Sequence, residues 1–165
     1  MKERLSTFPK KLISGYRFAK LKLRSFSFAL KVNILGGQCS YNIKLHGPII
    51  LLGDYRNLRI GDNVSLNHDV LLNCSAQIFI ESNVTISARC QLQTPYLDLT
   101  NRHIHRSKPI HLEQGCWIAA GTIIAAGSVI RQNTVVSALS FVKGELEHSS
   151  LYAGNPAIKI KNLPA

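Results

Sequence analysis

Aliphatic residues recur at every sixth position through the second half of the chain. The series runs unbroken over Leu112, Ile118, Ile124, Ile130, Val136 and Val142. The residue four positions after each of these is small in five of the six steps: Cys116, Thr122, Ser128, Thr134 and Ser140. The same spacing occurs upstream in two shorter series, offset from one another by two residues: Ile60, Leu66 and Leu72, then Ile80, Ile86 and Leu92.

A period of six is neither that of an α-helix nor that of a simple alternating strand. It fits short flat strands, three to a triangular coil, with aliphatic residues filling the interior and small residues at the corners. Stacked coils bury one continuous column, so each coil depends on its neighbours. The polar triplets at 61–63 and 81–83 fall at corners, where Gly and Asn suit turns. The pattern therefore predicts an all-β fold, a parallel β-helix.

The two ends of the chain follow other patterns. Apolar residues near the N-terminus are spaced by three or four: Leu5, Phe8, Leu12, Tyr16, Ala19, Leu23, Phe26 and Leu30. This spacing predicts an amphipathic helix, with Thr7 and Pro9 at its start and Gly36-Gly37 at its end. We expect this basic helix over 1–31, the β-helix over 32–154, and a short C-terminal capping helix and tail over 155–165, which Asn155-Pro156 can open.

One segment interrupts the six-residue rhythm. It reads TPYLDLTNRHIHRSKPI from Thr94 to Ile110 and contains two histidines, His103 and His105. We expect a loop extruded over 94–109. A loop that breaks a regular fold is more often functional than a core segment is.

Charge is distributed unevenly along the 165 residues. The net charge is +11, and residues 1–32 hold nine basic side chains against one acidic, whereas the remaining 133 hold eleven against eight. A basic amphipathic arm is typical of a helix lying on an anionic membrane surface, and docking on the first coil is the alternative. Nucleic acid is the weaker candidate, because the aromatic residues of the arm share its aliphatic stripe.

The chain lacks the ~20-residue apolar run of a membrane-spanning helix, since its longest aliphatic run is 49–52. Cys39, Cys74, Cys90 and Cys116 show no CxxC spacing. We therefore expect a cytoplasmic protein with reduced thiols, placed peripherally on the inner face of the membrane if the basic arm binds lipid. No set of His, Cys and acidic residues has metal-ligand spacing, so the sequence predicts no metal site.

Three short motifs accompany the repeat: Lys108-Pro109-Ile110, Gly115-Cys116-Trp117-Ile118, and the ending YAGNPA at 152–157. Together they resemble the hexapeptide-repeat acyltransferases, closest to the branch that O-acetylates colanic acid and related exopolysaccharides. The resemblance covers about residues 58–163. It implies a left-handed parallel β-helix, a homotrimer with sites between subunits, acetyl-CoA as co-substrate, and a saccharide acceptor in surface polysaccharide biosynthesis.

In that family the base is a loop histidine in a Thr-x-x-His-Asp or Thr-x-x-His-Pro setting. With Thr94 in the threonine place, Leu97 falls on the histidine and Asp98 on the following aspartate, a candidate substrate-binding residue. Leucine cannot accept a proton, so this departure leaves the base open.

Three alternatives follow from the missing histidine. His103 or His105 acts from the same loop, with His103 favoured because it is closer to Leu97 in sequence. Otherwise His68 acts, since Asn67-His68-Asp69 resembles the His-Asp pair of the sugar N-acetyltransferases. In the third alternative the base is lost and the chain is a binding or scaffold subunit.

The resemblance assigns the remaining candidates. Asn67 matches an acceptor-binding asparagine, although a turn or an asparagine column explains it equally well. Trp117 matches a tryptophan near the coenzyme, and the alternative is an outward residue at a subunit interface. Ala119 takes the place of a glycine whose backbone contacts the coenzyme sulfur side. Lys159 and Lys161 are the candidates for the coenzyme 3′-phosphate, and the alternative, a basic tail in solvent, fits Lys161 better.

Overall fold

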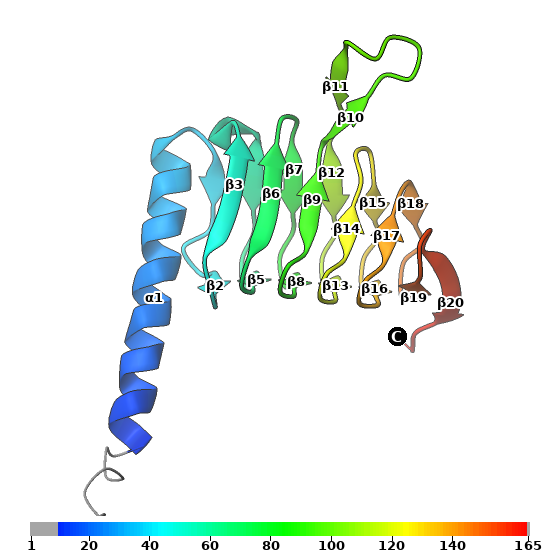
Figure 1. The fold of residues 1–165 in the computed structure, drawn as a ribbon. Helices are drawn as coiled ribbons and strands as arrows, with labels where there is room; N and C mark the ends of the chain where they lie inside the picture. The colour runs from blue at the N-terminus through cyan, green and yellow to red at the C-terminus, as the bar shows by residue number, and fades with distance from the viewer. Residues whose placement is uncertain (1–9, 165) are drawn as a thin grey trace, which may run out of the picture.

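The computed structural model describes residues 10–164 and consists of one helix followed by a parallel β-helix (Figure 1). Helix α1 (Lys10–Ile34) precedes the first coil. Three parallel sheets form the sides of the β-helix, and each strand pairs with its equivalent one coil further on. Because the chain visits the three sheets in turn, the interior is a single apolar column.

The first sheet is six-stranded, and its strands are β1 (Gln38–Cys39), β4 (Leu58–Ile60), β7 (Ile78–Ile80), β12 (Ile110–Leu112), β15 (Val129–Ile130) and β18 (Glu145–Leu146). The second is seven-stranded, with β2 (Lys44–Leu45), β5 (Ser65–Leu66), β8 (Thr85–Ile86), β13 (Trp117–Ile118), β16 (Val135–Val136), β19 (Ser150–Ala153) and β20 (Ile158–Asn162). The third is five-stranded, with β3 (Ile49–Gly53), β6 (Val70–Cys74), β9 (Gln91–Gln93), β14 (Ile123–Ile124) and β17 (Phe141–Val142).

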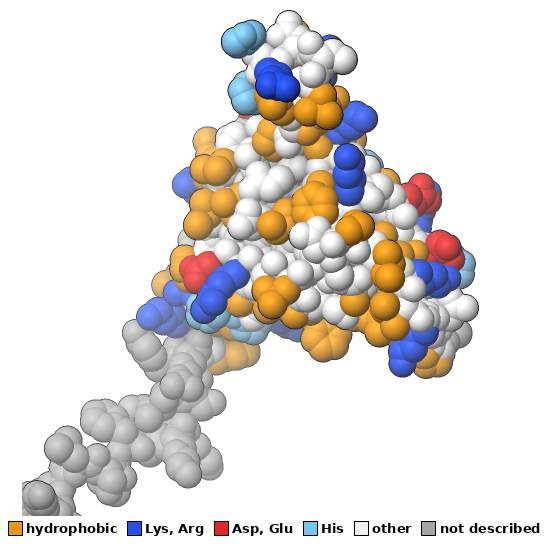
Figure 2. Space-filling view, turned by 45° about the vertical axis from the view of Figure 1, so that its right-hand side comes forward, with side chains coloured by type: hydrophobic (Ala, Val, Ile, Leu, Met, Phe, Trp, Pro, Cys, Tyr) orange, Lys and Arg blue, Asp and Glu red, His pale blue; other side chains and the backbone are white. Residues whose placement is uncertain are grey.

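A two-stranded hairpin leaves the β-helix between β9 and β12, at the corner between the third and first sheets. Its strands are β10 (Pro95–Leu97) and β11 (His105–Ser107). The hairpin stands clear of the body (Figure 2) and lies within the segment 94–109 that the sequence predicts as an extruded loop. The only other short element is a 3₁₀ turn, Tyr55–Asn57, that closes the first coil within the described residues.

The six-residue rhythm is the interior of the column. All six aliphatic residues of the long series are fully buried: Leu112, Ile118, Ile124, Ile130, Val136 and Val142. Burying a Val, Leu or Ile side chain stabilises a fold by ~1.5–3 kcal/mol. The stacked aliphatic residues therefore supply the main favourable contribution to stability, and the prediction of a parallel β-helix is confirmed.

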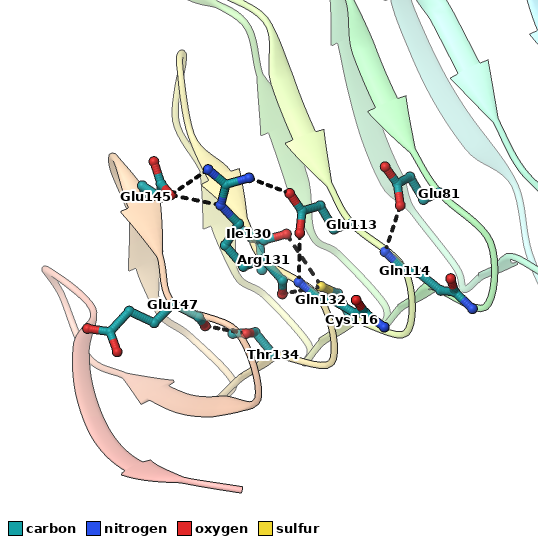
Figure 3. A network of polar contacts seen from close by, with 10 residues as sticks. All are labelled: Glu81, Glu113, Gln114, Cys116, Ile130, Arg131, Gln132, Thr134, Glu145 and Glu147. Atoms are coloured by element: carbon teal, nitrogen blue, oxygen red, sulfur yellow. Dashed lines mark hydrogen bonds and ion pairs between the residues drawn. The ribbon is translucent and has the colours of Figure 1, made fainter. Parts of the chain in front are cut away.

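The small residues between the aliphatic positions tie one coil to the next. Thr122, Ser128 and Thr134 are fully buried. The Thr122 hydroxyl donates to the Ser137 carbonyl at 3.0 Å, and the Thr134 hydroxyl donates to the Glu147 carbonyl at 2.5 Å (Figure 3). A small hydroxyl residue thus fits the corner and satisfies its own buried oxygen.

Polar contacts on the outer surface of the first sheet follow the same stacking. Arg131 lies between Glu113 and Glu145, one coil before and one coil after it, with N–O distances of 2.7 and 2.6 Å (Figure 3). At the corners, Asn63 and Asn83 adopt φ of +54° and +63°, and the Asn63 amide donates to Asn83 at 2.8 Å. These corners confirm the turns predicted at 61–63 and 81–83.

Helix α1 confirms the predicted N-terminal helix over its described part, whereas Leu5, Phe8 and the start signals Thr7 and Pro9 lie outside the described residues. The docking face, however, is formed by Ser25, Ala29 and Val32, which are buried against β1 and β2. Leu23 and Phe26 of the predicted stripe are 71% and 52% exposed.

Close packing explains which face of α1 docks. The Leu45 N–H donates to the Ser25 hydroxyl at 2.9 Å, so the first coil needs a small polar residue at this point. A bulky side chain there would hold the helix away from the coil. The predicted stripe therefore remains on the surface.

The predicted C-terminal helix is wrong. Residues 158–162 form strand β20, which pairs antiparallel with β19, placing Leu151 opposite Lys161. The last parallel strand leaves unpaired backbone N–H and C=O groups, and a returning strand satisfies them. The alternation Ile158-Lys159-Ile160-Lys161 is a strand pattern, and it was the signal for this ending.

Candidate functional site

The hairpin is anchored at its base by Thr94. This residue is fully buried, its hydroxyl donates to the Asn73 carbonyl at 2.6 Å, and it accepts from the Ala76 N–H at 3.0 Å. The Lys108 N–H donates to the Thr94 carbonyl at 3.0 Å and closes the base from the other strand. The hairpin therefore leaves a rigid coil at a fixed point.

Asp98 orders the far end of the hairpin. Its Oδ1 accepts from the Thr100 hydroxyl at 2.6 Å and from the Thr100 N–H at 2.9 Å, and its Oδ2 accepts from Arg106 at 2.7 Å. The Thr100 hydrogen bonds, and then the Arg106 guanidinium, hold the pKa of Asp98 below its ordinary value. Both carboxylate oxygens are thus engaged within the hairpin, and the substrate-binding role of Asp98 stays a prediction.

A groove of about 820 Å³ lies between the hairpin and the outer surface of the third sheet. Apolar side chains form much of its lining: Tyr96, Leu97, Leu99, Ile123 and Phe141. Three basic residues also line it: Arg106, Lys108 and Lys143. Figure 2 shows hydrophobic and basic side chains together below the hairpin. A groove of this kind suits a ligand that has both apolar and anionic parts.

Lys108 connects the hairpin to this groove. Its ammonium lies 5.4 Å from the centre of the Tyr96 ring, a cation–π distance. Its methylene stem passes so close to Gly127 that a Cβ added there would be 3.1 Å from Lys108 Cδ. Tyr96 and Phe141 were not predicted as site residues from the sequence, although Phe141 is an aromatic residue at an outward position beside the buried Val142.

The two hairpin histidines occupy different positions. His103 lies in the turn at the tip, where its backbone N–H donates to the Asn101 side chain at 3.2 Å. His105 lies in β11 directly opposite Leu97. Directly opposed residues of an antiparallel pair project from the same face, with Cβ atoms ~4.5–5.5 Å apart. The register therefore gives His105, and not His103, the place beside the position of the missing histidine.

A second group of predicted residues lies on the second sheet. Asn67 and Ala119 directly follow equivalent strands, β5 and β13, and Ser87 follows β8 between them. The half-exposed Trp117 donates from Nε1 to the Ser87 hydroxyl at 3.1 Å. The Asn67 amide donates to the Ile86 carbonyl at 3.2 Å, so part of its hydrogen-bonding capacity holds the column together.

His68 lies at the corner that follows Asn67. It is exposed, and its ring rests on Gly47 of the preceding coil, where an added Cβ would be 2.3 Å from Nδ1. Asp69 turns the chain with φ of +60°. Within the described residues no hydrogen bond joins His68 to Asp69, so the pair does not form the oriented base that its sequence resembles.

Lys159 already has a partner. Its ammonium lies 2.5 Å from Glu147 Oε2, and this pairing lowers the pKa of Glu147. A coenzyme phosphate would have to compete with that carboxylate for Lys159. Binding of the coenzyme 3′-phosphate by Lys159 therefore stays a prediction, and Glu147 is the anion that would compete for it.

The predicted residues thus form two separate groups. His103, His105 and Asp98 belong to the hairpin, at the corner between the third and first sheets. Asn67, His68, Trp117 and Ala119 lie on the second sheet or at its corner with the third. The full width of the third sheet, roughly 15 Å or more at ~3.3 Å per residue, separates the two corners. A single chain does not bring the two groups together.

The four cysteines are free thiols buried in the column. Burial raises the pKa of Cys39 and Cys74 to about 12 and that of Cys116 to about 11. Within residues 10–164, no three His, Cys, Asp or Glu side chains gather where they could share a metal ion. The described helix is not long and apolar enough to cross a membrane.

Comparison with known proteins gives the class to which this geometry corresponds. No family model matches the chain. The provisionally named acetyltransferase YJL218W of Saccharomyces cerevisiae is 29% identical over 132 residues, which are 77% of this chain and 66% of that protein. The provisionally named colanic acid biosynthesis acetyltransferase WcaF of Escherichia coli K12 is 28% identical over 134 residues, 81% of this chain and 73% of that protein.

Solved structures share the fold. A maltose O-acetyltransferase from Clostridium difficile 630 superimposes with a TM-score of 0.73 at 24% identity, covering 88% of this chain and 89% of that one. A hexapeptide-repeat acetyltransferase from Vibrio cholerae, complexed with acetyl coenzyme A, has the same TM-score and identity and covers 99% and 94%. The resemblance is therefore confirmed: the fold is that of hexapeptide-repeat acetyltransferases, and the sequence relatives are named as acetyltransferases.

Proposed function

We propose that this chain is an acetyl-CoA-dependent O-acetyltransferase that acts on a saccharide in surface polysaccharide biosynthesis. The observation that carries the proposal is the apolar and basic groove below an anchored hairpin, on the fold of the hexapeptide-repeat acetyltransferases. The colanic acid relative supports the polysaccharide context, and the maltose enzyme supports a sugar hydroxyl as acceptor. Acetyl-CoA is made in the cytoplasm, which is where we place the protein.

The groove has the two properties that acetyl-CoA needs. Its apolar lining suits the pantetheine arm, and Arg106, Lys108 and Lys143 offer positive charge to phosphates. The thiols of the chain are buried with raised pKa values, so none is placed to carry an acyl group. We therefore infer direct transfer from the coenzyme to the acceptor.

Direct transfer requires a base and a site for the oxyanion. The base takes the proton of the sugar hydroxyl as its oxygen attacks the thioester carbonyl. Backbone N–H groups stabilise the tetrahedral oxyanion. The C–S bond then breaks, the ester stays on the sugar, and the thiolate of coenzyme A takes up the proton held by the base.

His105 is the base that the geometry favours. It faces the same side of the hairpin as Leu97, which lines the groove. His103 sits in the tip turn, and His68 lies at another corner without an orienting partner among the described residues. Leu97 lines the groove and His105 does not, so His105 would act from beside the groove, through its place opposite Leu97 in the strand register.

Two separate groups of candidate residues support a site shared between subunits. We propose a homotrimer in which the hairpin of one subunit meets Asn67, Trp117 and Ala119 of the next. In this assembly Trp117 and the Ala119 backbone contact the coenzyme, while His105 and the groove residues come from the neighbouring chain. The same arrangement gives the half-exposed Trp117 a partner in the neighbouring subunit.

The test uses alanine substitutions at His68, His103 and His105. Each variant is assayed for release of coenzyme A thiol with nucleotide-sugars and oligosaccharides as acceptors. We expect His105→Ala to lower kcat by ~10²-fold or more with little change in acetyl-CoA binding, the usual effect of losing a general base. His103→Ala is the matched control, since it removes the other exposed histidine of the same hairpin.

The outcome discriminates among the alternatives. A loss confined to His103→Ala or His68→Ala would move the base to that residue. If an active preparation tolerates all three substitutions, no histidine base operates and the proposed mechanism fails. Acetyl-CoA binding by calorimetry tests the coenzyme assignment separately from turnover.

A catalytically weak or inactive subunit is the second candidate, and Leu97 is the observation that favours it. Leu97 lines the groove where the family places its proton acceptor. If the natural protein binds acetyl-CoA without turnover and Leu97→His creates acetyl transfer, the chain is a binding or scaffold subunit.

A further inference from the structure

Helix α1 has two apolar faces, and one of them packs on the first coil. Ser25, Ala29 and Val32 dock on the first coil. Leu23, Phe26, Leu30 and Ile34 follow one another at spacings of three and four residues and form a second, exposed stripe. We call these four residues the outer stripe. Among the described residues, this stripe makes a ring contact between Phe26 and Tyr41, with centroids 5.5 Å apart.

Basic residues accompany the outer stripe along the helix. The 25-residue helix contains seven Lys and Arg residues and no Asp or Glu: Lys10, Lys11, Arg17, Lys20, Lys22, Arg24 and Lys31. Among those whose side chains are described, Lys20, Lys22 and Lys31 are exposed. Exposed apolar residues bordered by lysines are typical of helices that lie in the interface of a bilayer.

The helix also extends beyond the β-helix. Figure 1 shows its N-terminal half projecting past the edge of the first coil. Phe18 lies seven residues before Ser25, on the line of the docking face, yet it is 59% exposed. Lys22 lies over its ring at 4.7 Å. At ~1.5 Å per residue the helix is about 38 Å long, so much of it is available to an external surface.

A second copy of the chain is the other candidate to cover the outer stripe, but its surface charge does not complement the positive charge of α1. Residues 33–165 carry eleven basic and eight acidic side chains. Several of those acids are already paired, as Asp54 is with Arg56 and Glu147 is with Lys159. A second copy therefore offers no strongly acidic surface to a helix with seven positive charges, whereas an anionic bilayer matches both the charge and the apolar stripe.

We infer that α1 holds the protein on an anionic membrane surface, with the outer stripe inserted between headgroups and its lysines on the phosphates. The docking face fixes the β-helix to the helix, so the body is held at the membrane. The inference is independent of acetyl transfer and would stand for an inactive subunit. Long lysine side chains can reach the headgroup level while their stems stay apolar.

The test is flotation of the full-length protein with vesicles. We expect binding to vesicles that contain phosphatidylglycerol, weak binding to pure phosphatidylcholine vesicles, and loss of binding at high salt. Leu23→Gln with Ile34→Gln removes the two most exposed stripe residues and should weaken binding by at least about tenfold. Lys20→Gln with Lys31→Gln should weaken it by roughly tenfold or more and reduce its salt dependence.

The matched control removes exposed aliphatic residues elsewhere. Leu139→Asn with Ile158→Gln alters residues that are 80% and 63% exposed near the other end of the β-helix, and should leave vesicle binding unchanged. Circular dichroism and light scattering check the fold and the mass of each variant. Equal binding of the stripe variant and the natural protein would overturn the inference. So would a change of oligomeric mass in the stripe variant, or binding to duplex nucleic acid in place of vesicles.

Discussion

At the scale of single residues, Ile118 tests the contribution of the interior column. It is fully buried between the coils before and after its own. Ile118→Ala should lower the free energy of unfolding by ~2–5 kcal/mol, because the removed atoms leave a cavity that stacked coils cannot close. Urea denaturation measures the change. Ile50→Ala, at a 47% exposed position of the third sheet, should change stability by less than about 1 kcal/mol.

Asp98 gives the hairpin a dependence on pH. Its pKa in the folded state is held below the ordinary 3.8, chiefly by Thr100 and further by Arg106. Folding favours the ionised form of Asp98. Its contribution to the stability of the hairpin is therefore complete above about pH 3.8 and is lost as the pH falls through the lower pKa of the folded state. The Thr100 amide signal in NMR spectra should therefore shift with a midpoint below 3.8.

Asp98→Asn should abolish that titration, because the amide has no charge to lose over this range. Asp69→Asn removes a carboxylate from a different corner and should leave the Thr100 midpoint unchanged. A Thr100 signal that titrates alike in the natural protein and in Asp98→Asn would show that another group orders the hairpin.

Sequence predicted interior residues better than site residues, and Leu97 shows why. A buried aliphatic residue is marked by a period that repeats in every coil, so Ile118 and Ile124 could be placed without a structure. The partner of Leu97 depends on where the hairpin turns. Proximity in sequence favoured His103, whereas the strand register places His105 opposite Leu97.

At the scale of elements, Ser25 decides how α1 docks. It is buried, and its hydroxyl oxygen accepts from the equally buried Leu45 N–H. Ser25→Ala leaves that N–H without its partner, which should lower the free energy of unfolding by about 1–3 kcal/mol. Urea unfolding measures the loss, and amide hydrogen exchange should rise at Leu45. Ser27→Ala is the control, since its exposed hydroxyl bonds only to Arg24 of its own helix among the described residues.

The ends of the chain were harder to predict than its middle. The periodicity of α1 predicted the helix correctly. The amphipathic spacing, however, indicated that the larger side chains form the packing face, whereas the close approach of the helix to the first coil requires small side chains there. At the other end, the pair Asn155-Pro156 suggested a helix start. Instead, residues 158–162, in which apolar and polar side chains alternate, pair as a strand with the open edge of β19. Both errors arise because the conformation of an end segment depends on the coil that it packs against, and the sequence of the segment alone does not contain that information.

At the scale of the whole molecule, the proposed homotrimer predicts a mass near three times 18.3 kDa. The fold leaves Trp117 on the second sheet and the hairpin at the corner between the third and first sheets, so a site that needs both requires neighbouring subunits. Light scattering on the folded protein measures the mass. A monomeric mass at concentrations where the protein is folded and active would remove the shared site.

Subunit mixing tests the shared site directly. His105→Ala impairs the hairpin contribution of a subunit, and Trp117→Ala impairs its contribution from the second sheet. If each site combines the hairpin of one subunit with the sheet of the next, two inactive variants can complement one another. Random reassembly at equal amounts pairs an intact hairpin with an intact sheet in about a quarter of the sites. The mixture should recover up to roughly that share of natural activity after joint refolding.

The same mixture separates the shared site from a site within one chain. If His105 and Trp117 served the same chain's site, every subunit in the mixture would carry a defect in its own site, and refolding together would restore nothing. The double variant His105→Ala/Trp117→Ala, refolded with the natural protein, supplies the reference. Its subunits impair both halves, so intact hairpin–sheet pairs again form in about a quarter of sites, but only from natural chains. Recovery in the single-variant mixture to that same level would therefore show that each active site is built from two chains.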